Sequence, residues 1–157
     1  MSKLLHALKF AKGIDPVADA LDATAYSDVY SLENYERIMF AMYFGEAATG
    51  VSLVKVNSCD NVTPDTRTEI PFWYREILAT DVESAITRAV AGTGFSFTAG
   101  SSKLVLIEVA AEDLIAGDKF VELDLVESTA DTDMVVGVMA ILGYGRYTED
   151  IKPTVLA

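Results

Sequence analysis

The sequence predicts a mostly β protein: a jelly-roll-like β-sandwich or barrel with one or two short helices and an N-terminal arm. Two observations support this fold class. Apolar or alternating runs of five to eleven residues recur along the chain, and clusters of Gly, Asn, Asp and Ser separate them. No internal repeat and no linker divides the 157 residues. We therefore expect an arm and irregular lead-in over residues 1–25 and a single β-rich domain over residues 26–157.

The chain begins with MSKLLHALKFAK, a basic and apolar segment. Leu4, Leu5, Leu8 and Phe10 could line one side of a helical turn or two. One interpretation is a loosely docked terminus, and the other is an arm that binds a neighbouring subunit. Because lysines interrupt the apolar run, the segment does not have the uninterrupted core of a signal peptide.

The segment YSDVYSLENYERIMFAMYFGE, residues 26–46, is rich in tyrosine. It predicts an edge strand over residues 28–32 and a buried strand over residues 37–44, which a hairpin loop would join to an alternating strand over residues 51–59. Both faces of residues 37–44 are apolar, which indicates burial on both sides, either between two sheets or between a sheet and a neighbouring subunit; core plus interface is the preferred interpretation. Tyr26, Tyr30 and Tyr35 are the expected interface anchors because tyrosine combines contact area with a polar tip.

The remaining elements follow from runs of apolar residues and the turn residues between them. Residues 60–68 are expected to form a loop, and residues 81–91 a helix, with a strand as the alternative. Residues 110–118 predict a helical turn that Gly117 ends. The other strands are expected over residues 69–77, 103–109, 120–128 and 134–144. In the strand over residues 120–128, Glu122 and Asp124 are expected on a solvent-facing side.

Composition limits the possible partners. A net charge of -12 disfavours binding to nucleic acid, whose phosphates attract Lys and Arg. No apolar run approaches the roughly 20 residues that a membrane-spanning helix needs. The single cysteine, Cys59, fits folding in a reducing cytosol. With 51% hydrophobic residues, some apolar surface should remain for subunit contacts.

Groups that could perform catalysis are few, so we expect no enzymatic activity, no cofactor and no metal. The one histidine, His6, lies in the arm, and Cys59 has no histidine nearby in sequence to activate it. Glu122 and Asp124 could form a carboxylate pair, but a polar stripe is the stronger interpretation. Acidic loops are weak candidates for calcium because none matches a known calcium-binding loop; their residues are Asp60, Asn61, Asp65, Asp131 and Asp133.

Several segments together resemble a group of small structural proteins of tailed bacteriophages. They are DVYSLENYERIMFAMYFG, IPFWYRE, KLVLIEVAAEDL and VVGVMAILGYGRY, and the resemblance spans about residues 28–147. The matching positions are Tyr35, Arg37, Phe40, Asp113, Leu114, Arg146 and Tyr147.

The resemblance implies a capsid decoration, or cement, protein. Such a protein would be made in the host cytoplasm and would bind the major capsid protein on the outer surface of the virion as a homotrimer. The residues expected at its oligomer or capsid interface are Leu4, Leu5, Leu8, Phe10, Tyr26, Tyr30, Tyr35 and Arg37. Two alternatives remain: a head-completion or tail-tube subunit, and a lectin-like sandwich that binds a sugar or calcium through Trp73, Tyr74 and loop acids.

Overall fold

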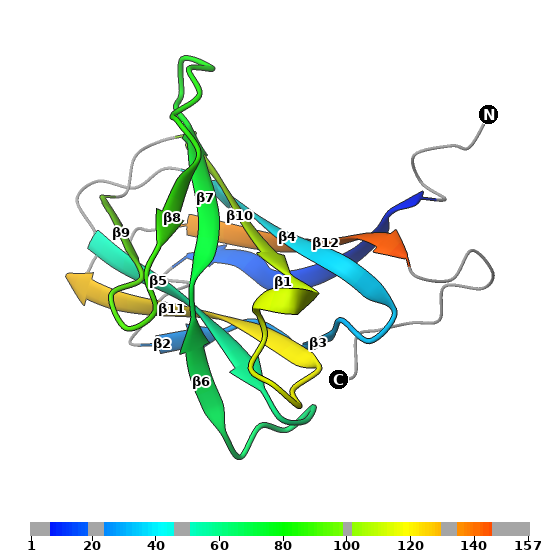
Figure 1. Ribbon diagram of the computed structural model, residues 1–157. Helices are drawn as coiled ribbons and strands as arrows, with labels where there is room; N and C mark the ends of the chain where they lie inside the picture. Colours follow the sequence, from blue (N-terminus) through cyan, green and yellow to red (C-terminus); the bar gives the residue numbers. More distant parts are fainter. Residues whose placement is uncertain (1–6, 19–23, 46–50, 99–101, 130–134, 146–157) are drawn as a thin grey trace.

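The computed structural model describes residues 7–18, 24–45, 51–98, 102–129 and 135–145. Two antiparallel sheets form a β-sandwich (Figure 1), which confirms the predicted fold class. Sheet A has the strand order β1-β12-β4-β10-β7-β8. Its strands are β1 (Lys9–Ala18), β4 (Tyr35–Phe44), β7 (Phe72–Ile77), β8 (Thr87–Ala89), β10 (Leu104–Ala110) and β12 (Val135–Gly145).

Sheet B is built around the pair β11 and β5, with shorter strands on either side. Strands β2 and β3 both pair with β11, and β6 and β9 both pair with β5. The bounds are β2 (Thr24–Tyr26), β3 (Tyr30–Ser31), β5 (Val51–Cys59), β6 (Arg67–Ile70), β9 (Phe95–Thr98) and β11 (Phe120–Thr129).

The core lies between the sheets and follows the two-residue alternation of each strand. Every second residue of β4, from Ile38 to Phe44, is fully buried. The facing side chains of sheet B are equally buried in β5 and β11; they are Val54, Val56, Val121, Leu123 and Leu125. This alternation leaves the opposite residues of each strand on the outer faces of the sandwich.

The N-terminal part of the chain differs from the prediction. Residues 9–18, expected as a helical turn and an irregular lead-in, form β1 and pair with β12 at the edge of sheet A. The register shifts between Lys12 and Ile14 and again between Ile14 and Val17, near Pro16. These irregularities are typical of edge strands, where a proline or a bulge costs few hydrogen bonds.

The predicted hairpin of residues 37–44 and 51–59 is wrong. Both segments are strands, but β4 lies in sheet A between β12 and β10, whereas β5 lies in sheet B beside β11. The connection therefore crosses from one sheet to the other. A short loop between two apolar strands fits both a hairpin within one sheet and a connection between two sheets. The hydrophobic pattern does not distinguish these two arrangements.

The predicted helix over residues 81–91 is also wrong. The backbone reverses direction just after β7: Leu78 donates to the carbonyl of Val82 and Ser84 donates to that of Glu76. Asp81 takes a positive φ of 57° in this turn. The chain then returns as β8, which pairs with β7. We call residues 78–86 the β7–β8 hairpin, and Figure 1 shows it projecting beyond the sandwich.

The expected helical turn over residues 110–118 is present in a shorter form. A 3-10 helix, η1 (Ala111–Asp113), follows β10, and Gly117 has a positive φ of 101° in the turn beyond it. The prediction for the acidic side of β11 is wrong, because Glu122 and Asp124 are only 3% and 9% exposed. Neighbouring side chains of sheet B cover them.

Candidate protein-interaction face

The outer face of sheet A carries apolar side chains from five adjacent strands. The register aligns Phe10 of β1 with Ile141 of β12, and Ile141 with Met39 of β4. The next row aligns Met139 with Ala41. We call this surface the apolar face; its outward residues are Phe10, Met39, Ala41, Tyr43, Trp73, Leu104, Leu106, Met139 and Ile141.

Large members of the apolar face are accessible to water. The exposed fractions are 40% for Phe10, 57% for Tyr43, 46% for Met139 and 43% for Trp73. Each square ångström of apolar surface removed from water stabilises a contact by about 25 cal/mol. A continuous apolar surface of this kind is typical of a protein-binding site.

A groove runs along the apolar face between β1 and the neighbouring strands. We call it the β1 groove. It has a volume of about 590 Å³, and Phe10, Tyr43, Leu104 and Met139 line it together with Gly137. Gly137 has no side chain, and its cross-strand partner Tyr43 extends outward. A methyl group added at Gly137 would contact Pro16 at 3.1 Å. The missing side chain thus helps to keep the groove open.

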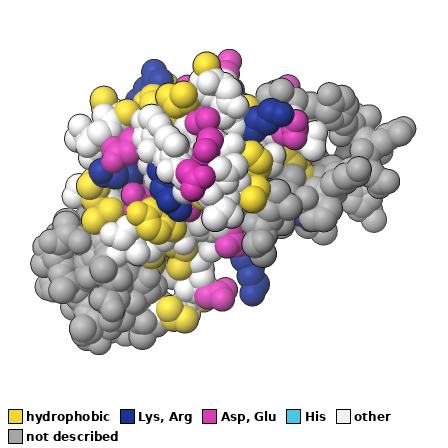
Figure 2. Space-filling view, turned by 90° about the horizontal axis from the view of Figure 1, so that it is seen from below, with side chains coloured by type: hydrophobic (Ala, Val, Ile, Leu, Met, Phe, Trp, Pro, Cys, Tyr) yellow, Lys and Arg dark blue, Asp and Glu magenta, His cyan; other side chains and the backbone are white. Residues whose placement is uncertain are grey.

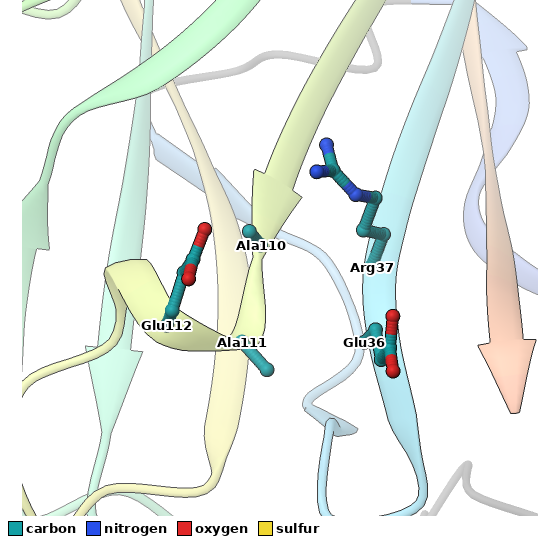
Figure 3. Close-up of a pocket in the computed structure, with 5 residues that line it drawn as sticks. All are labelled: Glu36, Arg37, Ala110, Ala111 and Glu112. Carbon is teal, nitrogen blue, oxygen red and sulfur yellow. The ribbon is translucent and has the colours of Figure 1, made fainter. Parts of the chain in front are cut away.

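At one end of the face, an arginine lies between two hollows. Arg37 donates a hydrogen bond to Glu108 on the adjacent strand, and this bond raises the pKa of the guanidinium. One hollow of about 470 Å³ contacts Arg37, Leu8 and Tyr144. The other, of about 390 Å³, lies between β4 and η1. Figure 3 shows Arg37 and Glu36 from β4 on one side of it and Glu112 from η1 on the other.

Several charges around the apolar face occur as pairs of opposite sign. Four pairs combine one cation with one acid each: Lys12 with Asp15, Arg37 with Glu108, Arg75 with Glu83, and Arg88 with Asp113. Together these pairs carry no net charge, whereas the whole chain carries -12. These pairs lower the repulsion that a second acidic protein would meet at the apolar face.

The outer face of sheet B has a different character. Arg67 Nε lies 2.7 Å from Glu122 Oε2, and Lys55 Nζ lies 2.5 Å from Glu69 Oε1. The Arg67 guanidinium also covers the ring of Tyr26 at 4.9 Å. Figure 2 views the molecule from below Figure 1, the side on which β6 lies, and shows acidic and basic side chains next to one another. Two ion pairs and one cation–π contact therefore lie on this surface.

Among the described residues, no group of three or more His, Cys, Asp and Glu side chains could hold a metal ion. Burial raises the pKa of the Cys59 thiol to about 12, so the nucleophilic thiolate does not form near neutral pH. His6, Asp131 and Asp133 lie outside the described residues. No helix of the described part has the length and apolar character needed to cross a membrane.

Three of the predicted interface residues lie together on the outer side of sheet A. Phe10 belongs to the apolar face, and Leu8 and Arg37 line the same hollow at its end. Tyr26 is exposed but lies on the outer face of sheet B, beside Arg67. Leu4 and Leu5 fall outside the described residues.

The predictions for Tyr30 and Tyr35 need correction. Both side chains are fully buried within the chain, so neither provides surface for a partner. Tyr30 packs edge-on against Phe40 with 5.7 Å between ring centroids. A tyrosine in a strand can point to either face, and the sequence around these two did not show which face was inward.

Two residues of the apolar face, Met139 and Ile141, were not singled out from the sequence. Met139 and Ile141 belong to a strand that is apolar on both sides, and this is the signal that could have identified them. Trp73 is exposed, and Arg88 lies over its ring at 5.6 Å from the centroid. Its neighbour Tyr74 is stacked on Phe95 at 3.9 Å and is partly buried.

Comparison with known proteins gives only distant structural likenesses. No protein-family model matches the chain, and no curated protein matches its sequence. The SPBc2 prophage-derived protein YomS shares 10% identity at a TM-score of 0.48, with 86% of this chain and 91% of that chain covered. The CBM22-1-GH10 modules of Clostridium thermocellum endo-1,4-beta-D-xylanase 10B, complexed with xylohexaose, share 10% identity at a TM-score of 0.41. That match covers 94% of this chain and 28% of the xylanase chain. Neither likeness specifies a function.

Proposed function

We propose that this protein is a non-enzymatic virion structural protein, a capsid decoration or cement protein that contacts other proteins through the apolar face of sheet A. In this proposal it assembles as a homotrimer and binds the major capsid protein on the outside of the shell. The observation that carries the proposal is the exposed apolar face, which four ion pairs of opposite charge surround.

Two further observations support it. The sequence resembles small structural proteins of tailed phages between about residues 28 and 147. In addition, the thiol of Cys59 is buried, and burial raises its pKa, as expected for a residue with a packing role. A cement protein would hold its partners through a large contact area, and the broad outer face of a sheet supplies such an area.

The test measures the solution mass by light scattering and then mixes the protein with expanded empty capsids of tailed phages. We expect a trimer that saturates the shells. Substituting Met139→Glu on the apolar face should lower both trimer formation and capsid binding, because a charge would be buried in the contact. The matched control is Val62→Glu, a substitution of an exposed apolar residue in the loop before β6. A monomer that ignores the capsids would contradict the proposal.

One observation favours a second candidate, a ligand-binding sandwich. Trp73 is the single tryptophan and is exposed, as a platform for a sugar ring requires. Titration with oligosaccharides while tryptophan fluorescence is recorded tests it directly. A saturable change that Trp73→Ala removes would support this candidate, and an unchanged spectrum would exclude the oligosaccharides tested.

A further inference from the structure

The β7–β8 hairpin exposes apolar side chains that the core does not use. Leu78, Val82 and Ile86 are 45%, 57% and 60% exposed, respectively. The backbone bond from Leu78 to Val82 and the bridge between Ile77 and Glu83 hold the hairpin in shape. It is therefore an ordered projection with an apolar surface, and such a projection fits a matching hollow on a partner.

A hollow of suitable character lies at the opposite edge of the same sheet. The β1 groove is bounded by Phe10, Tyr43 and Met139 and has a volume of about 590 Å³. An engineered cavity of about 150 Å³ already accepts benzene, so the groove has room for several aliphatic side chains. Five strand spacings of about 4.8 Å separate β8 from β1, roughly 24 Å, so the hairpin of a chain does not reach its own groove.

Charges on the two elements are complementary. The hairpin contains Asp81 and Glu83 and no basic residue; Arg75 of β7 pairs with Glu83, so Asp81 supplies the net negative charge of the projection. Strand β1 contains Lys9 and Lys12 against the single acid Asp15, and the side chain of Lys12 is largely exposed. An acidic projection would therefore approach a slightly basic edge, which favours a defined orientation.

We propose that the β7–β8 hairpin of one copy docks in the β1 groove of a second copy of this chain. This inference rests on the proposed function, because it specifies which partner covers part of the apolar face. Projection and groove are different surfaces, so the contact is heterologous. A heterologous contact closes into a ring when the rotation between copies permits, and a ring of three is the trimer proposed above.

Cross-linking between two differently substituted proteins tests the contact. One protein carries Val82→Cys in the hairpin and the other carries Tyr43→Cys in the groove; native Cys59 is buried in both. A disulfide requires Cα atoms within about 7 Å, so oxidation of the mixture reports direct docking. The control pairs Val82→Cys with Thr63→Cys, an exposed loop position beside sheet B.

A second experiment measures the oligomer mass of Leu78→Asp/Val82→Asp. Both side chains are exposed, so the variant should fold, and we expect the dissociation constant of the oligomer to rise at least about tenfold. The docking is supported if Val82→Cys and Tyr43→Cys form disulfide cross-links and if the double substitution raises the dissociation constant of the oligomer.

Two results would overturn it. An oligomer that forms without those cross-links, or that tolerates the double substitution, refutes the hairpin contact and leaves the proposed function standing. A protein that remains monomeric at all concentrations and ignores the capsids refutes both.

Discussion

The hydroxyl group of Tyr30, in sheet B, donates a hydrogen bond to the carbonyl oxygen of Lys12, in sheet A. Lys12 lies where the register of β1 shifts, so this carbonyl is next to an irregularity in the ladder. Burial raises the pKa of Tyr30, which keeps the hydroxyl protonated as a donor. The bond connects the two sheets at the edge of the sandwich.

Tyr30→Phe should therefore lower the free energy of unfolding by about 1–2 kcal/mol, because the Lys12 carbonyl loses its partner. Chemical denaturation measures the change. Tyr35→Phe is the matched control: its hydroxyl is buried without a hydrogen-bond partner among the described residues, so removing it should change stability little. Equal effects of the two substitutions would contradict the assignment.

Asp124→Asn should stabilise the protein at pH 7 by on the order of 1 kcal/mol, because it removes a buried charge. Burial raises the pKa of the Asp124 carboxyl above 3.8, and the nearby acids Glu122 and Glu69 add to the rise. Lys55 and a hydrogen bond from Asn57 oppose it. The Oδ1 atom has no hydrogen-bond partner among the described residues.

The sign of the pH dependence follows from proton binding. The folded state holds the Asp124 proton more tightly than the unfolded chain, so the contribution of Asp124 to stability falls as pH rises from 3.8 through the raised pKa. The advantage of Asp124→Asn should grow over the same range. A pH-independent difference would refute the prediction.

Arg67→Ala should destabilise the fold by about 1–2 kcal/mol, because the nearly buried carboxylate of Glu122 loses its ion-pair partner. This expected loss of stability is smaller than the loss on breaking a fully buried ion pair, because the Arg67 side chain is partly exposed. Lys119→Ala removes an ion pair in which both side chains are exposed and should cost less. Thermal unfolding of both variants provides the comparison, and a larger effect at Lys119 would argue against this explanation.

Gly94→Ala should disrupt the turn that precedes β9. Gly94 has a positive φ of 65°, and an added methyl group would lie 2.4 Å from the carbonyl oxygen of Val54. Backbone would have to move, so we expect a loss of more than about 2 kcal/mol. Gly92 also has a positive φ, but nothing lies within 4 Å of an added methyl. Gly92→Ala should cost only about 1 kcal/mol, and similar losses would refute the steric explanation.

The fold class and most strands could be predicted because strand alternation depends on local sequence. Residues 37–44 were expected to be a strand with an apolar surface on both sides. In β4, Phe40 is buried, whereas Tyr43 is exposed on the other side. What covers that side stays a prediction, since strand patterning identifies an apolar face and does not identify its partner.

The errors arose where a pattern fits two structures. The helix predicted over residues 81–91 would place Val82, Ile86, Ala89 and Val90 on one side. Of these only Ala89 is buried, and the other three are exposed along the path from β7 to β9, so the spacing did not reflect a buried helix face. Likewise, the amphipathic start of the chain fits a helical turn, but β12 offers residues 9–18 an edge to pair with. Pairing over more than 100 residues of sequence cannot be recognised in a local window.

That long-range pairing also determines when the protein can fold as it is synthesised. The two neighbours of β4 in sheet A are β10 and β12, and both follow it in the chain. Translation at about 5–20 residues per second needs roughly 5–20 seconds to proceed from residue 44 to residue 145. During that time this largely apolar strand has no complete sheet around it, so the nascent chain exposes apolar surface and unpaired strand edges that favour aggregation.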